Sequence, residues 1–287
     1  MKNKLTKTSK FGRVRQLISR TACLGVIILT CSSALAQSLF VSSDAAGGNV
    51  YEFTPSGVRS TFASGLSGGL AFDNTGNLFV TADAIYEFTP GGVLTTFASG
   101  PGGTPACDGA GNLFVTTGDT DIYEFPINGS GKIYKFTPYG IRSTFASGLD
   151  LPTALAFDNS GNLFVADVST HGNNNLRGAI YKFTSGGVRS TFASGLTNPE
   201  GLAFDNAGNL FVADPNPGTG AIYKFTPTGH RSTFASGFNW AGSLACDDAG
   251  NLFVADSPAH AIYKFTPGGV RTTFAATDGV NLLAFQP

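Results

Sequence analysis

A repeated segment of about 40 residues is the feature that most constrains the fold of this chain. Its clearest copy runs from Gly201 to Gly237 and holds four short runs of aromatic and β-branched residues, each bounded by Gly, Pro, Asn or Asp. Such runs predict β-strands joined by tight turns. Four short strands per repeat, copied along a chain, are typical of the blades of a β-propeller. The four runs in this copy are Leu202–Phe204, Leu210–Val212, Ala221–Phe225 and Arg231–Phe234.

The number of copies predicts six blades. Five whole repeats are marked by the second-strand sequence Asn-Leu-Phe-Val, and a sixth is divided between the two ends of the chain. We expect its C-terminal strand, residues 282–285, to pair with the N-terminal blade, which closes the ring and leaves no long strand edge open. The predicted fold is therefore all-β, a six-bladed β-propeller with four antiparallel strands per blade. The five copies of the marker begin at Asn77, Asn112, Asn162, Asn209 and Asn251.

The first 36 residues have the composition of an export signal. They contain seven basic residues, no acidic ones, and a mostly apolar run from Thr21 to Thr30. Ala34-Leu35-Ala36 matches a small-residue cleavage site. We therefore predict a signal peptide over residues 1–36, cleaved after Ala36, and a single propeller domain over residues 37–287 that is secreted or periplasmic. Cys31 leaves a lipoprotein as the alternative.

The net charge of the chain beyond residue 36 limits the classes of partner that it can bind. Seven of its 18 basic residues leave with the signal and all 19 acidic residues remain, so the formal charge becomes −8. A mildly acidic chain without a basic cluster argues against nucleic acid and against anionic membranes as partners. Cys107 and Cys246 replace the same first-strand Phe in blades on opposite sides of the ring. We expect no disulfide between them, and we expect a monomer.

Sequence variation concentrates on one face of the predicted disc. The loops from second to third strands, and the connections between blades, differ in length and composition, as expected where a rigid scaffold carries function on its loops. Trp240 lies on one of these connections. This loop face is the predicted binding face. Its expected loops are Thr116–Gly131, Ser169–Gly178, Asp214–Gly220 and Asp256–His260.

Three segments carry a family resemblance: Asn198–Asp205, Gly208–Asp214 and Ile222–Phe225. They resemble the NHL repeat and are similar to the wider six-bladed group that includes the gluconolactonase–regucalcin lactonases. The resemblance covers essentially the whole chain after the leader and implies the six-bladed fold. For a lactonase it also implies one divalent cation, such as Ca²⁺, near the mouth of the central channel. Its carboxylate and amide ligands come from the residue just before the Gly that opens each first strand.

The candidate metal ligands follow from that resemblance. Of the six matching positions, only Glu200 and Asn281 carry suitable side chains, and Gly or Thr occupies Gly68, Gly103, Thr153 and Gly242. Three carboxylates at the ends of second strands would complete the set, namely Asp167, Asp214 and Asp256. These three also fit a structural role, because Asp after a strand commonly accepts hydrogen bonds from the backbone amides of a turn.

Two functions of different classes fit the sequence best. The leading hypothesis is an exported binding module that holds a protein, peptide or glycan on its loop face. The alternative is a metal-dependent, lactonase-like hydrolase with a divalent cation at the channel mouth. A structural protein of the cell envelope is a third reading. We assign no catalytic residue, because the chain lacks a Gly-x-Ser-x-Gly elbow with matching His and Asp residues.

Overall fold

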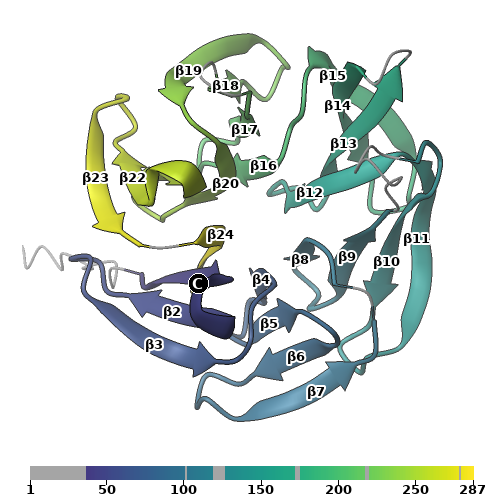
Figure 1. Ribbon diagram of the computed structural model, residues 1–287. Helices are drawn as coiled ribbons and strands as arrows, with labels where there is room; N and C mark the ends of the chain where they lie inside the picture. The colour runs from purple at the N-terminus through teal and green to yellow at the C-terminus, as the bar shows by residue number, and fades with distance from the viewer. Residues whose placement is uncertain (1–36, 101, 119–126, 172–174, 217–219, 278) are drawn as a thin grey trace, which may run out of the picture. The chain divides into compact units, whose positions relative to one another are not determined.

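The computed structural model describes residues 37–287 except 101, 119–126, 172–174, 217–219 and 278. They lie in one compact unit, Leu35–Pro287. Its described strands form six four-stranded antiparallel sheets around a common centre (Figure 1), so the predicted six-bladed β-propeller is confirmed. Residues 1–36 lie outside the described residues, and their role as a signal peptide stays a prediction. In the described part of the chain, no helix is long and apolar enough to cross a membrane.

Blade 1 joins the two ends of the propeller. The C-terminal strand β24 pairs antiparallel with β1, with Leu39 opposite Phe285 and Ser42 opposite Leu282, which confirms the predicted closure. A short 3-10 helix, η1 (Ala45–Gly47), links β1 to β2. The strands of blade 1, in sheet order, are β24 (Val280–Phe285), β1 (Leu39–Ser43), β2 (Asn49–Phe53) and β3 (Arg59–Ser64).

The other five blades use consecutive strands, and in Figure 1 the first strand of each lies nearest the centre and the fourth at the rim. Blade 2 has β4 (Gly69–Phe72), β5 (Leu78–Thr81), β6 (Ile85–Phe88) and β7 (Leu94–Ala98). Blade 3 has β8 (Pro105–Cys107), β9 (Leu113–Thr117), β10 (Gly131–Phe136) and β11 (Arg142–Leu149). Blade 4 has β12 (Leu151–Phe157), β13 (Leu163–His171), β14 (Asn175–Phe183) and β15 (Arg189–Leu196).

Blades 5 and 6 follow the same order, and a second 3-10 helix, η2 (Ser257–Ala259), links β21 to β22. Blade 5 has β16 (Gly201–Phe204), β17 (Leu210–Asp214), β18 (Gly220–Phe225) and β19 (Arg231–Phe238). Blade 6 has β20 (Ala241–Cys246), β21 (Leu252–Asp256), β22 (Ala261–Phe265) and β23 (Arg271–Ala276).

Blade 4 departs from the expected loops. The prediction of a loop over Ser169–Gly178 is wrong, because β13 and β14 continue as a paired ribbon beyond the body of the blade. Ser169 lies opposite Arg177, and the pairing reaches His171 opposite Asn175. Each added residue pair extends the antiparallel hydrogen-bond ladder, which satisfies backbone groups that a loop would leave to water. Residues 119–126 of the expected loop Thr116–Gly131 lie outside the described residues.

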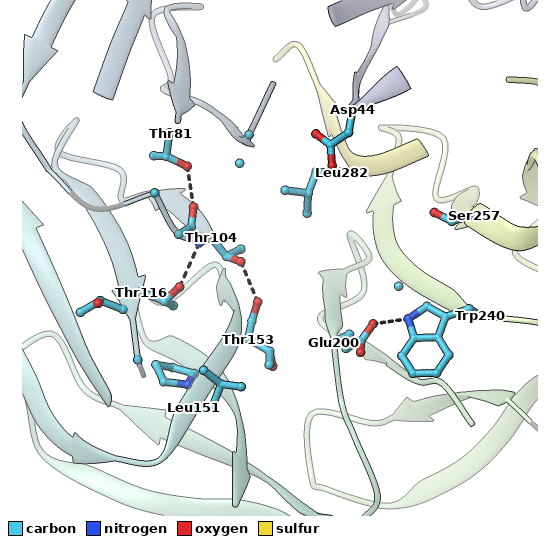
Figure 2. Close-up of a pocket in the computed structure, with 18 residues that line it drawn as sticks. Asp44, Thr81, Thr104, Thr116, Leu151, Thr153, Glu200, Trp240, Ser257 and Leu282 are labelled. Carbon is cyan, nitrogen blue, oxygen red and sulfur yellow. Dashed lines mark hydrogen bonds between the residues drawn. The ribbon is translucent and has the colours of Figure 1, made fainter. Parts of the chain in front are cut away.

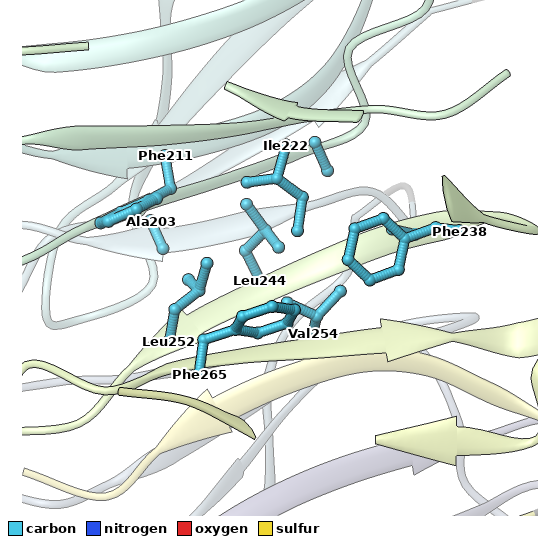
Figure 3. Packing of buried hydrophobic residues seen from close by; sticks show 10 residues of the cluster. Ala203, Phe211, Ile222, Phe238, Leu244, Leu252, Val254 and Phe265 are labelled. Atoms are coloured by element: carbon cyan, nitrogen blue, oxygen red, sulfur yellow. The ribbon is translucent and has the colours of Figure 1, made fainter. Parts of the chain in front are cut away.

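The hydrophobic core lies between neighbouring blades. In the cluster of Figure 3, Phe211 and Ile222 of blade 5 pack with Leu244 and Val254 of blade 6, and all four side chains are buried. Phenylalanine rings interlock across the same interfaces: in blade 4, Phe164 makes edge-to-face contacts with Phe192 of its own blade and with Phe204 of blade 5. The repeated Phe residues therefore serve the packing of neighbouring blades.

A recurrent turn joins first to second strands on the face opposite the loops. In blade 5 the carboxylate of Asp205 accepts hydrogen bonds from the backbone N–H groups of Ala207 (3.0 Å) and Asn209 (2.8 Å). Gly208 takes the positive φ, 78°, that such a tight turn requires. The second oxygen of Asp205 lies 3.5 Å from Lys224 Nζ on the third strand. The turn thus fixes the register of three strands at once.

Candidate binding site at the channel mouth

The first strands of the six blades surround a pocket of about 610 Å³ at the loop end of the central channel (Figure 2). All six blades contribute to its lining, and Gly and Thr supply most of it. We call it the channel-mouth pocket. Its lining residues are Asp44, Gly68, Gly69, Thr81, Gly102, Gly103, Thr104, Thr116, Thr117, Gly118, Leu151, Pro152, Thr153, Glu200, Trp240, Gly242, Ser257 and Leu282.

Glu200 is held in this pocket by two neutral side chains. Asn198 Nδ2 donates a hydrogen bond to Oε1 (2.6 Å), and Trp240 Nε1 donates one to Oε2 (2.7 Å). Asn198 lies on the connection into blade 5 and Trp240 on the connection into blade 6, so the carboxylate ties two blades together at the mouth. Figure 2 shows the indole with its N–H directed at Glu200.

The surroundings of Glu200 disfavour its charge without neutralising it. Burial raises the pKa of Glu200, and the negative charge of Asp214 acts in the same direction. The hydrogen bonds from Trp240 and Asn198 lower that pKa but do not offset the burial. A carboxylate oxygen has two lone pairs, so each oxygen keeps an acceptor site for a ligand. Glu200 is therefore a pre-oriented acceptor in a partly desolvated pocket.

Threonines line the other side of the pocket in Figure 2, which we call the threonine side. Thr81 donates its hydroxyl hydrogen to the carbonyl of Gly103, Thr104 to that of Thr153, and Thr153 to that of Pro199. These bonds link blades 2 to 5 around the mouth. Because each hydroxyl hydrogen is bonded to a carbonyl, these oxygens can act toward a ligand only as acceptors. The members of the threonine side are Thr81, Thr104, Thr116 and Thr153.

Sequence reasoning missed the threonine side, although the repeat contains its signal. Thr81 and Thr116 are buried and stand where the second strands of blades 4, 5 and 6 have Ala166, Ala213 and Ala255. A polar residue in an apolar repeat position needs a hydrogen-bond partner when it is buried. The break in the repeat thus marks blades 2 and 3, where the hydroxyl groups of Thr81 and Thr116 form hydrogen bonds at the mouth.

Asp214 and Asp256, two of the predicted ligands, lie under the loops of blades 5 and 6. Their side chains are 7% and 2% exposed. Asp214 accepts hydrogen bonds from the backbone N–H groups of Thr197 (3.0 Å) and Asn198 (2.6 Å). Asp256 accepts them from Asn239 (3.1 Å) and Trp240 (2.9 Å). Both carboxylates therefore fix the connections that carry Asn198 and Trp240 to Glu200.

Asp167 has the same place in blade 4. It is 5% exposed, and both of its oxygens lie 3.1 Å from the backbone nitrogen of Asp150. Burial raises the pKa of Asp167 to about 6, and the charge of Asp150 adds to the rise. The structural role that the sequence left open for these three Asp residues is thus seen in all three blades, and none of the three lines the channel-mouth pocket.

Close backbone approach explains two of the glycines at the predicted ligand positions. A Cβ atom at Gly68 would lie 2.0 Å from the carbonyl oxygen of Thr81, and one at Gly103 would lie 2.0 Å from that of Thr116. Blades 2 and 3 therefore cannot present a ligand side chain there. Asn281 lies in β24 beside the mouth, and its side chain is outside the described part of the structure.

The described residues do not fit the cation that the resemblance implies. Among them, no group of three or more His, Cys, Asp or Glu side chains could hold a metal ion. Ca²⁺ takes about six to eight oxygen ligands, whereas Glu200 and Asp44 are the only carboxylates among the described lining residues. The ligand set of Glu200, Asn281, Asp167, Asp214 and Asp256 stays a prediction for metal-binding measurements.

Comparison with known proteins identifies what this chain is similar to. The profile of the SMP-30/Gluconolactonase/LRE-like region matches residues 36–236. Among solved structures, a gluconolactonase from Xanthomonas campestris is 17% identical, with a TM-score of 0.60 over 75% of this chain and 77% of its own. Regucalcin, a calcium-binding protein from Agrobacterium tumefaciens, is 18% identical, with a TM-score of 0.54 over 77% and 81%.

A third solved structure has a different name and a similar fold. TolB from Acinetobacter baumannii is 14% identical, with a TM-score of 0.68 over 88% of this chain and 66% of its own. No curated protein sequence matches the chain. At these identities the structural likenesses show the fold alone, which proteins of different function share.

Proposed function

Since this chain belongs to the SMP-30/gluconolactonase/LRE-like family, we propose that it uses the channel-mouth pocket of its propeller to bind a small organic ligand, or the terminal residue of a peptide or glycan. The observation that carries the proposal is the fixed orientation of the Glu200 carboxylate inside the pocket. Two side chains from different blades orient its carboxylate, and both keep it inside the pocket. Pre-organised polar groups in a concave site are the ordinary basis of ligand recognition.

The dimensions of the pocket support a small ligand. Its volume of about 610 Å³ falls in the usual range of about 300–1,000 Å³ for small-molecule sites. Gly242 leaves the mouth open where a larger side chain would crowd Glu200 and Trp240. A folded protein cannot enter such a space, but a terminal residue can. If the partner is a protein, peptide or glycan, we therefore expect only its terminal residue to enter the pocket.

Ligand screening on the purified protein tests this proposal. A metabolite collection would be screened by ligand-observed NMR, and hits would be confirmed by calorimetry. The matched blocked variant is Gly242→Leu, because a Cβ at this position already lies 3.2 Å from Glu200 Oε2 and 3.7 Å from Trp240 Cδ1. We expect hits that the blocked variant loses while its melting temperature is retained. Hits that bind both proteins equally would place the binding elsewhere and overturn the proposal.

Lactone hydrolysis is a second candidate, and Glu200 also favours it. A carboxyl group with a raised pKa in a pocket is suited to general acid–base catalysis, and the family includes gluconolactonase in its description. Calorimetry with Ca²⁺, Mg²⁺, Mn²⁺ and Zn²⁺ on chelator-treated protein, followed by a lactone screen, tests it. Turnover that is lost in Glu200→Gln would establish an enzyme. Absence of both metal binding and turnover would leave the binding function alone.

Export is a separate proposal that rests on residues 1–36. Fractionation of producing cells, with N-terminal sequencing of the product, would test it. A mature protein that begins at Gln37 in the periplasm or the medium is the expected result, and a cytoplasmic protein that begins at Met1 would contradict it.

A further inference from the structure

The charged groups that line the channel-mouth pocket have one sign. Glu200 and Asp44 are acidic, and none of the described lining residues is Lys, Arg or His. The two side chains that donate hydrogen bonds to Glu200, Asn198 and Trp240, are neutral. A partly buried carboxylate is costly unless a positive charge balances it. The pocket therefore favours a ligand that brings a positive charge.

Independently of charge, the hydrogen-bonding groups of the pocket favour a ligand that is rich in donors. Thr81, Thr104 and Thr153 each donate their hydroxyl hydrogen to a backbone carbonyl. A hydroxyl has one hydrogen and two lone pairs, so these three oxygens can offer a ligand only acceptor sites. Glu200, whose two oxygens also only accept, completes an acceptor-rich lining. An ammonium group, with three donors and no acceptor, matches such a lining.

Trp240 adds an aromatic surface beside the carboxylate. Its N–H is bound to Glu200 Oε2, which fixes the orientation of the ring, and in Figure 2 the indole lies beside Glu200 with its N–H edge toward the carboxylate. The backbone N–H of Trp240 is held in turn by Asp256 at 2.9 Å. An indole face attracts cations through its quadrupole, and Trp is the most effective side chain for this contact.

We propose that the channel-mouth pocket recognises a primary ammonium group, seated against Glu200 and beside the face of Trp240. The inference rests on the proposed ligand-binding function and specifies its ligand chemistry. The ammonium group has two sources of suitable size, a free organic amine and the N-terminal residue of a peptide. Both present the same charge and donors to Glu200, and the threonine side accepts hydrogen bonds from the rest of the ligand.

The test uses probes that differ in charge and little else. Phenethylamine, phenethyl alcohol and hydrocinnamate carry an ammonium, a hydroxyl and a carboxylate on similar frames, and triglycine is compared with N-acetyl-triglycine for the peptide source. Trp240 is the only Trp of the chain, so its fluorescence reports binding in the pocket directly. We expect at least one ammonium probe to bind about ten-fold or more tightly than its uncharged partner.

Two variants locate the effect. Glu200→Gln should weaken binding of the ammonium probe about ten-fold or more, and calorimetry measures this even if the Trp240 emission changes. Glu87→Gln removes a carboxylate from β6, which is not part of the pocket lining, and should leave the affinity unchanged. Asp44→Asn keeps Glu200 in place and should weaken binding to a smaller extent, so the test stands even if Glu200→Gln folds poorly.

The outcomes distinguish the ammonium inference from the ligand-binding function on which it rests. Binding of phenethylamine alone supports a free amine, and binding of triglycine but not its acetylated form supports a peptide N-terminus. Equal binding of charged and uncharged probes would overturn the ammonium inference and leave the ligand-binding function intact. If no probe binds, and the metabolite screen also gives no hit, both proposals are wrong.

Discussion

Asp167, Asp214 and Asp256 show how one residue type serves the loops of three blades. Each follows the Leu-Phe-Val-Ala run of a second strand and accepts hydrogen bonds from the backbone of the connection that enters its blade. These bonds satisfy amides that the sheet does not reach. They also hold Asn198 and Trp240 where both can contact Glu200. The metal set predicted from the sequence thus contains residues that act on the pocket through the backbone.

Asp167 makes the stability of the protein depend on pH. Its folded pKa, about 6, is above its ordinary value of 3.8, so its stabilising contribution is complete below about pH 4 and is lost as the pH rises through 6. A difference of about two units corresponds to about 3 kcal/mol. We expect the free energy of unfolding of the wild type to fall by up to this amount, relative to Asp167→Asn, between pH 4 and pH 7.

Urea unfolding of both proteins at several pH values measures this effect. Only the pH dependence of the difference matters, because the Asn side chain alters the bonds to Asp150 at every pH. The variant Asp150→Asn provides a control: it removes a charge that raises the pKa of Asp167, so the pH dependence should become weaker. A constant difference between wild type and Asp167→Asn across this range would contradict the prediction.

The two cysteines of the propeller should be unreactive. Cys107 and Cys246 are free, and burial raises the pKa of both thiols, that of Cys246 to about 12. Alkylation requires the thiolate. We expect iodoacetamide at pH 8 to modify both residues in the native protein at least about a hundred-fold more slowly than in urea. Mass spectrometry of timed samples measures this, and equally fast labelling in both states would show that the thiols are accessible.

The sequence predicts part of the site and not the rest. Glu200 is identifiable as a carboxylate in a position where three other blades have Gly. Its bond to Trp240 is not, because the two residues are 40 apart in the sequence and the indole could point either way from its connection. The hydrogen bonds of the threonine side are likewise not predictable, because the rotamer of each Thr decides whether its hydroxyl binds a carbonyl or faces the pocket. Repeat spacing fixes positions along a strand, but it carries no information on rotamers.

At the scale of elements, the third strand and the first turn of a blade are joined by a recurrent ion pair. Lys135, Lys182, Lys224 and Lys264 lie 3.5 to 4.0 Å from the turn Asp of their own blades. Each also lies over the Phe ring of the second strand, at 5.1 to 5.3 Å. These four lysines are therefore part of the packing of their blades.

Blade 2 breaks this pattern, and its repair should stabilise the protein. Glu87 stands opposite Phe79, where blade 4 places Lys182 opposite Phe164. Burial and the charge of Asp73 raise the pKa of Glu87, which shows that the turn disfavours an anion there. Glu87→Lys would replace a repulsion by an ion pair and a cation–π contact. We expect a gain of about 0.5–1 kcal/mol in the free energy of unfolding.

Urea unfolding at neutral pH measures the gain, with Lys224→Glu in blade 5 as the reverse substitution. That variant should lose a comparable amount, because it creates the same unfavourable pair with Asp205. High salt should reduce both effects, since the groups are partly exposed. If Glu87→Lys is no more stable than the wild type, the ion pair does not contribute to the packing of the blades.

Strands and their order are the part of the fold that the sequence predicts well. Repeated Gly, Pro and Asp residues mark the ends of each strand, and the Asn-Leu-Phe-Val marker sets the register between blades. The ribbon of β13 and β14 shows the limit. Its Asn-rich composition favours a loop, yet backbone pairing extends through His171 and Asn175. Composition cannot decide this case, because the ladder is formed by backbone groups that every residue type has.

At the scale of the whole propeller, blade 1 is the one that depends on both ends of the chain. Leu283 of β24 packs with Leu39 and Val41 of β1 and with Phe253 of blade 6, so β24 completes the interface between blades 1 and 6. A hydrogen bond from Gln286 N to Ser38 O (3.2 Å) extends the pairing past the strand ends. In the other blades a tight turn makes the equivalent connection, whereas here folding must bring distant segments together.

Removal of β24 should therefore destabilise the entire ring. A chain that ends at Gly279 loses the buried Leu283 and exposes the edge of β1. Loss of one buried Leu costs about 2–5 kcal/mol, and an exposed strand edge favours aggregation. We expect a melting temperature at least about 10 °C lower and association on heating, measured by calorimetry and light scattering.

A permuted chain separates the loss of the strand from the loss of its covalent position. In this chain residues 280–285 precede Leu39 and are joined to it by a copy of the turn Asp205–Asn209, which makes blade 1 continuous like the others. Its melting temperature should equal or exceed that of the parent, because closure becomes a local hairpin instead of a contact between distant segments. A truncated chain as stable as the parent would show that five complete blades support the fold. A permuted chain that fails to fold would show that the closing strand must be added last.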